Sequence, residues 1–479
     1  MKKLTATGVI ALVLFFLGII SGGSKAAGQS VSSWRCFSCH HGIGMKWYSS
    51  KHSQTQTDVA TELANSHPGE TPDQVISSEN CIGCHGPTAV LASGTRMSES
   101  QTLGYFFATV GGVFTPNTAP ANASKWSNVD CTSCHNVPSQ HPDTLAKLAA
   151  FNSSTGRYVK VKGPNDLCGR CHGNLRFPKT DHLIYNAWAT SKHSQTQKDV
   201  AKELADSHPG ETPDQVISSE NCIGCHGPTS VRVNGGITES QALGYFFTTE
   251  GGKFTKGTRP GKTSEWPAVG CSSCHDPHSP DQPAYYNSAT NQYEAVGDTS
   301  QLCGQCHGNL RFPDTDHLSY NIVQGTRGVN VPDQQTMPRV TCIDCHMYTN
   351  GQDGSNSTKY KGHTFKVMVN EADGTQSAAC TNCHSDMDAA AASQKIAQWQ
   401  GEFQKTDAQA QDLVGKADKA LNGVSDPALQ SKLDEAKQNL NYAESDESKG
   451  FHNHNYLMAL VNDAITRSQE ILSQLGIPF

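Results

Sequence analysis

The chain has 479 residues and a formal charge of −7 at pH 7, and only 36% of its residues are hydrophobic. This acidic balance argues against nucleic acids and anionic membrane surfaces as partners and mildly favours cationic or mineral ones. An apolar fraction this low predicts a thin protein core for a chain of this length.

The first 26 residues have the pattern of a secretory signal peptide. Lys2 and Lys3 precede an apolar run over residues 8–20, and Ser24-Lys25-Ala26 fits a cleavage site. A permanent membrane anchor is the alternative, but a spanning helix needs roughly 20 apolar residues, and no later segment is apolar enough to span. We therefore expect export to the periplasm or to the extracellular or outer surface, and a mature charge near −10 once Lys2, Lys3 and Lys25 are lost.

The pentapeptide Cys-x-x-Cys-His follows this leader, occurs nine times and uses all 18 cysteines. Zinc ribbons and thiol redox pairs share the Cys-x-x-Cys spacing, but neither requires a histidine after it. The pattern is the attachment sequence of c-type haem, in which two thiols bond the porphyrin and the histidine binds the iron. We therefore predict nine covalently bound haem c groups. Their porphyrins would also supply the apolar core that the chain's low apolar fraction does not provide. The attaching cysteines are Cys36, Cys39, Cys81, Cys84, Cys131, Cys134, Cys168, Cys171, Cys222, Cys225, Cys271, Cys274, Cys303, Cys306, Cys342, Cys345, Cys380 and Cys383, and the proximal ligands are His40, His85, His135, His172, His226, His275, His307, His346 and His384.

An internal repeat of about 140 residues dominates the chain. Lys-His-Ser-Gln at 51–54 recurs at 192–195, and Leu-Gly-Tyr-Phe-Phe at 103–107 recurs at 243–247. Each repeat carries three haem motifs, so duplication of a trihaem unit accounts for both. We expect the aromatic clusters to pack on porphyrin faces, with a substrate-facing role as the alternative.

The sequence predicts a mainly α protein with extensive loops, wrapped on a haem core and closed by a C-terminal helical segment. Helical periodicity begins at Ala389, Asn422-Gly423 is a stop, Asp426-Pro427 starts a second helix that runs to about Glu444, and a third begins near Asn453. This segment either packs across the haem core or pairs with a second subunit. The predicted parts are the signal peptide (1–26), a lead haem with the first trihaem repeat (27–190), the second trihaem repeat (191–327), a two-haem segment (328–388) and the haem-free helical segment (389–479).

Twelve further histidines are available as second axial ligands. Histidine on both sides gives a saturated iron that moves electrons, whereas an empty position can bind a substrate. Many of the twelve occupy repeated contexts, which favours ligation, whereas His41 and His454 are weaker candidates. The predicted distal ligands are His52, His67, His141, His182, His193, His208, His278, His317, His363 and His452.

One element of the repeat lacks its histidine at its third expected position. The Trp-x-x-Ser-Lys-His element should recur after the second repeat, but aligning Tyr185 with Tyr320 puts Gly328 where His193 stands. If a histidine there normally serves the Cys380 haem, that iron recruits another ligand or stays open.

From Lys192 onward the chain resembles the multihaem superfamily of pentahaem cytochrome c nitrite reductases and octahaem hydroxylamine oxidoreductases. The resemblance is carried by Trp-Ala-Thr-Ser-Lys-His at 188–193, Val-Thr-Cys-Ile-Asp-Cys-His-Met at 340–347 and Gly-Phe-His-Asn at 450–453. It implies His193 as the distal ligand of the Cys303 haem, His363 for the Cys271 haem and His452 for the Cys342 haem.

Departures from this family bear on function. The nitrite reductases have a proximal lysine where this chain has His226, and their catalytic tyrosine after the third motif is replaced here by Gly-Asn-Leu-Arg-Phe at 308–312. Their downstream catalytic histidine also has no counterpart, because only His317 follows that motif. Nitrite reduction is therefore not expected, although hydroxylamine oxidoreductases do use a histidine-ligated catalytic haem.

The sequence thus favours electron transfer through closely packed, mostly bis-histidine, low-potential haems, with no catalytic residue. The expected partners are redox proteins or extracellular electron acceptors. An oxidoreductase with one open haem acting on a small nitrogen or sulfur oxyanion is one alternative. A filament-forming haem conduit, or a homo-oligomer through the C-terminal helices, is another.

Overall fold

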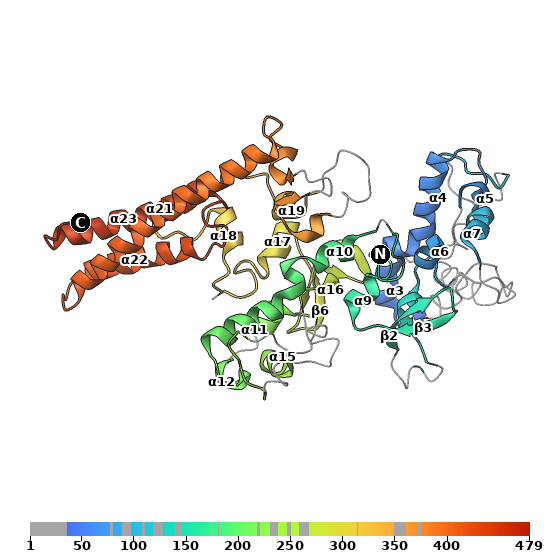
Figure 1. The fold of residues 1–479 in the computed structure, drawn as a ribbon, viewed down its shortest axis with the longest axis horizontal. Helices are drawn as coiled ribbons and strands as arrows, with labels where there is room; N and C mark the ends of the chain where they lie inside the picture. Colours follow the sequence, from blue (N-terminus) through green and yellow to red (C-terminus); the bar gives the residue numbers. More distant parts are fainter. Residues whose placement is uncertain are drawn as a thin grey trace, which may run out of the picture. The chain divides into compact units, whose positions relative to one another are not determined.

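The computed structural model describes residues 36–76, 80–88, 97–107, 111–117, 128–138, 141, 146–180, 182–217, 221–229, 238–246, 251–257, 268–313, 315–348, 361–370 and 376–479. The expected signal peptide lies outside these residues. The chain divides into two compact units, Met1–Val161 and Lys162–Phe479 (Figure 1). This boundary falls within the first trihaem repeat, ahead of the Cys168 motif.

The first unit consists of short helices and one small antiparallel sheet in the order β1-β2-β3. Its elements are α3 (His41–Tyr48), the 3-10 helix η1 (Lys51–Gln54), α4 (Thr55–Ser66), α5 (Pro72–Val75), α6 (Asn80–His85), α7 (Glu99–Phe106), α8 (Cys131–Cys134), β1 (His135–Asn136), β2 (Lys147–Asn152) and β3 (Arg157–Lys160).

The second unit repeats this plan and then extends it. The repeated part comprises α9 (Pro164–Cys168), α10 (Ile184–Ala189), η4 (Lys192–Gln195), α11 (Thr196–Ser207), α12 (Pro213–Val216), α13 (Asn221–His226), α15 (Glu239–Phe246), α16 (Cys271–Cys274), β4 (His275–Asp276), β5 (Ser279–Asn287), β6 (Gln292–Ala295), α17 (Thr299–Gly304) and α18 (Ser319–Gln324). The extension comprises α19 (Cys342–His346), η7 (Lys361–Thr364), β7 (Met368–Asn370), β8 (Gln376–Ala378), η8 (Ala379–Asn382), α21 (Ala389–Leu421), α22 (Pro427–Glu444) and α23 (His454–Gln474).

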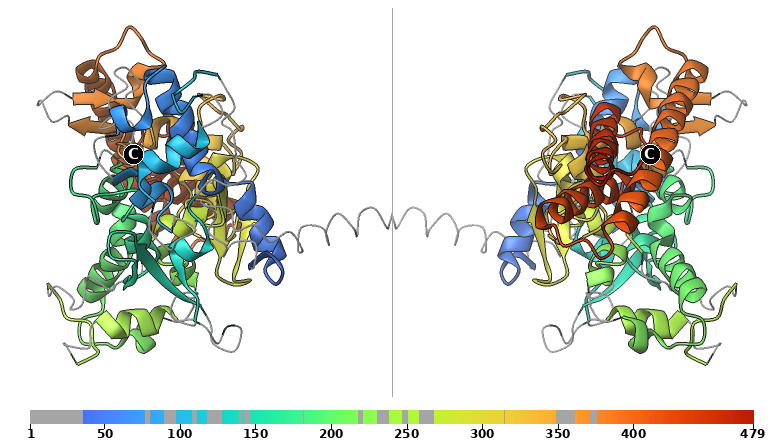
Figure 2. Two further views of the ribbon diagram at one scale, coloured as in Figure 1. Left: turned by 90° about the vertical axis from the view of Figure 1, so that its right-hand side faces the viewer. Right: turned by 90° about the vertical axis from the view of Figure 1, so that its left-hand side faces the viewer.

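The three C-terminal helices form a bundle, which Figures 1 and 2 show in orange and red. Asp388 caps α21 by accepting from the Ala391 N–H, and Asp426 caps α22, which has Pro427 at its first position. The apolar faces of the helices make the largest hydrophobic cluster described, in which Leu457, Leu460 and Val461 are fully buried. The predicted mainly α fold with a helical C-terminal segment is therefore confirmed, and no helix in the described ranges is long and apolar enough to cross a membrane.

Outside the bundle the protein cores are small, as the low apolar fraction predicts. One surrounds α4 and α7, where Phe107 is 1% exposed and meets Phe114 edge to face at 5.3 Å between ring centroids. Its counterpart around α11 and α15 contains Phe254. The side chain of Phe107 therefore packs in a protein core, and the prediction that this aromatic covers a porphyrin is wrong. The side chains of Tyr105, Phe106, Tyr245, Phe246 and Phe247 lie outside the described part.

Candidate haem sites

The Cys36, Cys168, Cys303 and Cys380 motifs each contain one helical turn. The His40 N–H donates to the Cys36 carbonyl at 2.8 Å, and the same bond recurs at His172, His307 and His384. Because side chains at i, i+3 and i+4 share one face of a helix, both thiols and the imidazole point to the same side. All 18 cysteines are described, and all are free of disulfides. This set of donors fits covalent haem attachment.

Two proximal imidazoles are oriented by backbone carbonyls. His275 Nδ1 lies 3.1 Å from the Pro280 carbonyl oxygen, and His346 Nδ1 lies 3.1 Å from that of Phe365. With Nδ1–H donating to a carbonyl, Nε2 carries the lone pair that a metal needs.

Four proximal rings face a second histidine ring at one characteristic separation. The centroid distances are 5.9 Å for His40–His141, 6.2 Å for His226–His317, 6.0 Å for His307–His193 and 5.9 Å for His346–His452. An iron bound by two imidazole nitrogens at about 2 Å each holds the ring centroids roughly 6 Å apart. The rings are thus spaced for one iron between each pair.

A fifth pair comprises His363 on η7 and His275, which lie close enough to interact electrostatically. Burial, with the nearby His275 adding to it, lowers the pKa of His363 to about 4. Burial likewise lowers the pKa of His193 and of His226 to about 4, with neighbouring histidines adding to the effect. All three rings are therefore neutral at pH 7, and neutral imidazole is the form that binds a metal.

A buried carboxylate lies next to the Nδ1 atom of His452. Asp446 Oδ1 lies 2.7 Å from His452 Nδ1, and the aspartate side chain is 0% exposed. Burial pulls the pKa of His452 down, but the hydrogen bond and charge of Asp446 outweigh it, and the net pKa is raised. Asp446 is a candidate supporting residue that sequence reasoning missed, since nothing local distinguishes it.

The two repeats reproduce the same supporting contacts. Thr55 Oγ1 donates to the His85 carbonyl at 2.6 Å, and Thr196 Oγ1 donates to that of His226 at 2.6 Å. The indole N–H of Trp47 donates to the Val129 carbonyl at 2.8 Å, and Trp188 does the same with Val269. These contacts tie η1 and η4, which carry His52 and His193, to the haem motifs of their own repeat.

The structure brings neither of the repeated histidines His67 and His208 to a described proximal ring of its own unit. Each sits at the C-terminal end of its helix, about two-fifths exposed, with Nδ1 3.4 Å from a glutamate three residues later. Their repetition is explained by the turn that follows, where the Gly69 N–H donates to the Phe114 carbonyl and that of Gly210 to Phe254. The structure does not support these two as ligands.

The other candidates are placed as follows. His278 Nδ1 lies 3.3 Å from Asp276 Oδ1, while His52 and His182 are partly buried. His41 is exposed. His454 is buried in the bundle, where its ring stacks on Trp399 at 5.1 Å and Nδ1 lies 2.9 Å from the Gly450 carbonyl oxygen.

Thiols of neighbouring motifs in the second unit lie close enough for one to shift the pKa of the other. The pairs are Cys168 with Cys271, Cys225 with Cys306, and Cys303 with Cys342. In the last pair the pKa of Cys342 is lowered and that of Cys303 is raised. Cys274 also interacts with Cys303 and Cys306, and the motif helix α19 packs against η8 of the Cys380 motif. The six motifs of this unit therefore form one contiguous series.

The Arg311 side chain links two of these motifs by hydrogen bonds. Its guanidinium donates to the Gly224 carbonyl at 2.9 Å and to Ser288 Oγ at 2.8 Å, and it stacks over Phe312 at 4.8 Å. Gly224 lies inside the Cys222 motif, and Arg311 follows the Cys303 motif. The sequence signal for it is the Asn-Leu-Arg-Phe-Pro string that both repeats carry after the third motif.

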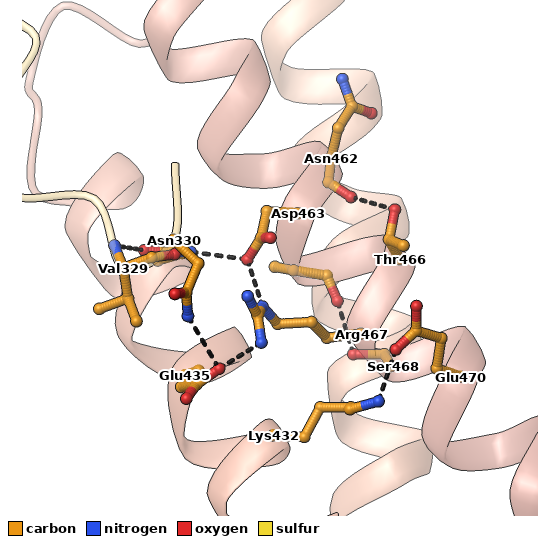
Figure 3. Close-up of polar contacts among 12 residues, drawn as sticks. Val329, Asn330, Lys432, Glu435, Asn462, Asp463, Thr466, Arg467, Ser468 and Glu470 are labelled. Atoms are coloured by element: carbon orange, nitrogen blue, oxygen red, sulfur yellow. Dashed lines mark hydrogen bonds and ion pairs between the residues drawn. The ribbon is translucent and has the colours of Figure 1, made fainter. Parts of the chain in front are cut away.

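The segment containing Gly328 is held by the bundle. The Gly328 N–H donates to Tyr456 Oη at 2.7 Å, and Tyr442 Oη donates to the Thr326 carbonyl at 2.7 Å. Asn439 bonds both the N–H and the carbonyl of Val329, at 2.8 and 2.9 Å. Figure 3 shows Val329 and Asn330 against the bundle's polar network, in which Asn330 reaches Glu435 and Arg467 bonds both Glu435 and Asp463.

Three protein families match parts of the chain. "Cytochrome c552" matches residues 333–476, "Doubled CXXCH motif" matches 267–312, and "Cytochrome c554 and c-prime" matches 35–104 and 167–244. No curated protein sequence matches the chain.

Several solved structures are similar at 16% identity. The outer cell wall cytochrome OcwA has a TM-score of 0.48, covering 93% of this chain and 100% of its own. An undecahaem cytochrome from the S-layer of Carboxydothermus ferrireducens has a TM-score of 0.44, covering 100% and 74%. Cytochrome c nitrite reductase from Desulfovibrio desulfuricans has a TM-score of 0.37, covering 59% and 70%. The motif geometry and the three family matches together identify the chain as a multihaem c-type cytochrome.

Proposed function

We propose that this cytochrome is an exported electron conductor carrying nine haem c groups, most of them ligated by histidine on both sides. The observation that carries the proposal is the contiguous series of motifs whose thiols lie close together. A thioether formed at each sulfur would bring neighbouring porphyrin edges together. Haem supplies a one-electron iron couple when bound, and the chain's residues anchor it, ligate it and hold neighbours in order.

The paired histidines support conduction over catalysis at those sites. With haem bound, a second imidazole about 6 Å from the proximal one would fill the remaining axial position, leave no place for a substrate and favour a low-potential, low-spin iron. The leader over residues 1–26 supports export to the periplasm or the outer surface, where redox proteins or extracellular acceptors are the partners.

Two measurements test this proposal. Mass spectrometry of the mature protein should count nine attached haems, and coulometric oxidation of the fully reduced protein should release nine electrons per chain. A smaller haem count, or haems that stay reduced on the electrode while others discharge, would contradict a continuous conductor.

A further inference from the structure

Phe365, which follows η7, contacts one histidine from each of three haem sites. Its ring centroid lies 4.2 Å from that of His193 and 6.2 Å from that of His363. Its carbonyl oxygen lies 3.1 Å from His346 Nδ1. In the pairs described above, these histidines belong in turn to the motifs of Cys303, Cys271 and Cys342. One residue thus meets the candidate ligands of three consecutive motifs.

The backbone of Phe365 is strained. Its φ is 57°, in the left-handed region that a bulky side chain rarely adopts. The Phe365 N–H donates to the Gly362 carbonyl at 3.1 Å, which closes η7, and β7 begins at Met368. Glycine would make this turn without steric cost. Phenylalanine in such a conformation persists only where its surroundings hold it, and such strain clusters at functional sites.

The ring of Phe365 is set to restrain its two imidazole neighbours. It stands at 88° to the ring of His193 and at 69° to that of His363. Aromatic rings attract each other edge to face, because the ring face is negative and the edge positive. A ring packed in this way opposes rotation of the imidazole about its Cβ–Cγ bond. Packing of η7 against both α10 and α19 holds the whole turn in place.

We propose that Phe365 is a positioning residue for three haems of the conductor. Its ring fixes the imidazole planes of His193 and His363, and its carbonyl oxygen fixes the plane of His346. Contacts of this kind orient a metal's ligands and tune the metal. The inference rests on the proposed multihaem conductor and gives three of its sites a shared control on ligand orientation.

Electron paramagnetic resonance of the oxidised, haem-loaded protein tests the role of the ring. The g values of a low-spin haem depend on how its two imidazole planes are turned relative to each other. His193→Ala, His363→Ala and His452→Ala each remove one low-spin signal, which identifies the haems of Cys303, Cys271 and Cys342. Phe365→Leu should then shift the first two signals and leave the third in place, because the carbonyl is retained.

The matched control is Phe177→Leu. Phe177 lies in the same unit, its ring stacks with the Arg176 guanidinium at 4.8 Å, and among the described residues it has no histidine contact. This variant should move none of the three signals. Phe365→Gly serves where the leucine protein loses haem, because glycine adopts a positive φ freely. It should shift the same two signals.

Phe365→Pro tests the role of the carbonyl. Proline fixes φ near −65° and cannot keep the observed turn, so the Cys342 signal should shift as well. Unmoved Cys303 and Cys271 signals in the leucine and glycine variants, or an equal shift in Phe177→Leu, would overturn the role of the ring. An unmoved Cys342 signal in Phe365→Pro would overturn that of the carbonyl. Haem count and released charge are measured separately, so failure of the conductor proposal is distinguishable from failure of this one.

Discussion

Asp446 Oδ1 lies 2.7 Å from His452 Nδ1, and the carboxylate is fully buried. A carboxylate hydrogen-bonded to an imidazole raises the ligand's basicity and stabilises the more positive metal state. Asp446→Asn should therefore raise the reduction potential of the Cys342 haem. A tenfold loss of preference for the ferric form corresponds to about 59 mV for a one-electron couple. Spectroelectrochemical titration measures the shift.

The matched control is Asp434→Asn, because Asp434 is exposed on α22 and bonds only Gln430 of its own helix among the contacts described. It removes the same charge without touching a histidine. Equal potentials in the two variants would contradict a role for Asp446 behind His452.

A second prediction concerns Gly328, which packs against helix α23 of the bundle. Gly328→Ala should destabilise the docking of α22 and α23 by about 1–3 kcal/mol, since the new Cβ overpacks against Tyr456 and Leu460. Hydrogen exchange of amides in α23 measures the change locally. Gly401→Ala is the control. Gly401 lies within α21 with nothing within 4 Å of a built Cβ, so alanine there should stabilise the helix by about 1 kcal/mol. The same protection in both variants would refute the close packing at Gly328.

The ends of the C-terminal helices could be predicted because stop and start residues stand at those positions in the sequence. Asn422-Gly423 and Asp426-Pro427 fall at the observed boundaries of α21 and α22. The hairpins were not predictable, because strands such as β2 and β3 are short and their residues mix polar and apolar side chains.

Histidine pairing depended on tertiary structure. The partner of His307 lies on η4, 114 positions earlier. No local pattern encodes that distance, and only the family resemblance implied this pairing. Repetition was also an ambiguous signal. It marked His193, which faces a proximal ring, and equally marked His208, which closes a turn.

His193 and His208 therefore make an informative pair of variants. His193→Ala should convert one haem, that on Cys303, from low to high spin, because the ring opposite His307 is removed. Electron paramagnetic resonance of the oxidised protein counts the change. His208→Ala should leave the spin state of every haem unaltered, since that ring is exposed beside Glu211. A high-spin haem gained in His208→Ala would restore it as a ligand.

Asp407 gives a pH-dependent prediction within the bundle. Burial and the neighbouring Glu444 raise its pKa to about 6, above the value of about 3.9 in an unfolded chain. The folded state thus holds the proton more tightly, so folding loses stability as pH rises from about 4 to about 6, and the full cost remains above that. Asp407→Asn should stabilise the bundle at pH 7 by on the order of 1 kcal/mol, after solvent screening of a partly exposed group, and change little at pH 4.

Hydrogen exchange of α21 and α22 amides at the two pH values checks this sign. Gln411 donates to both Asp407 and Glu444, so an asparagine keeps one neutral acceptor in place while the repulsion is removed. Asp412→Asn is the matched control, because Asp412 is exposed and pairs with Lys416 at 2.8 Å. Its replacement should cost a few tenths of a kcal/mol at pH 7 instead of adding stability. If Asp407→Asn stabilised the bundle equally at pH 4 and pH 7, the gain would come from helix propensity or packing, and the carboxyl pair would not be its cause.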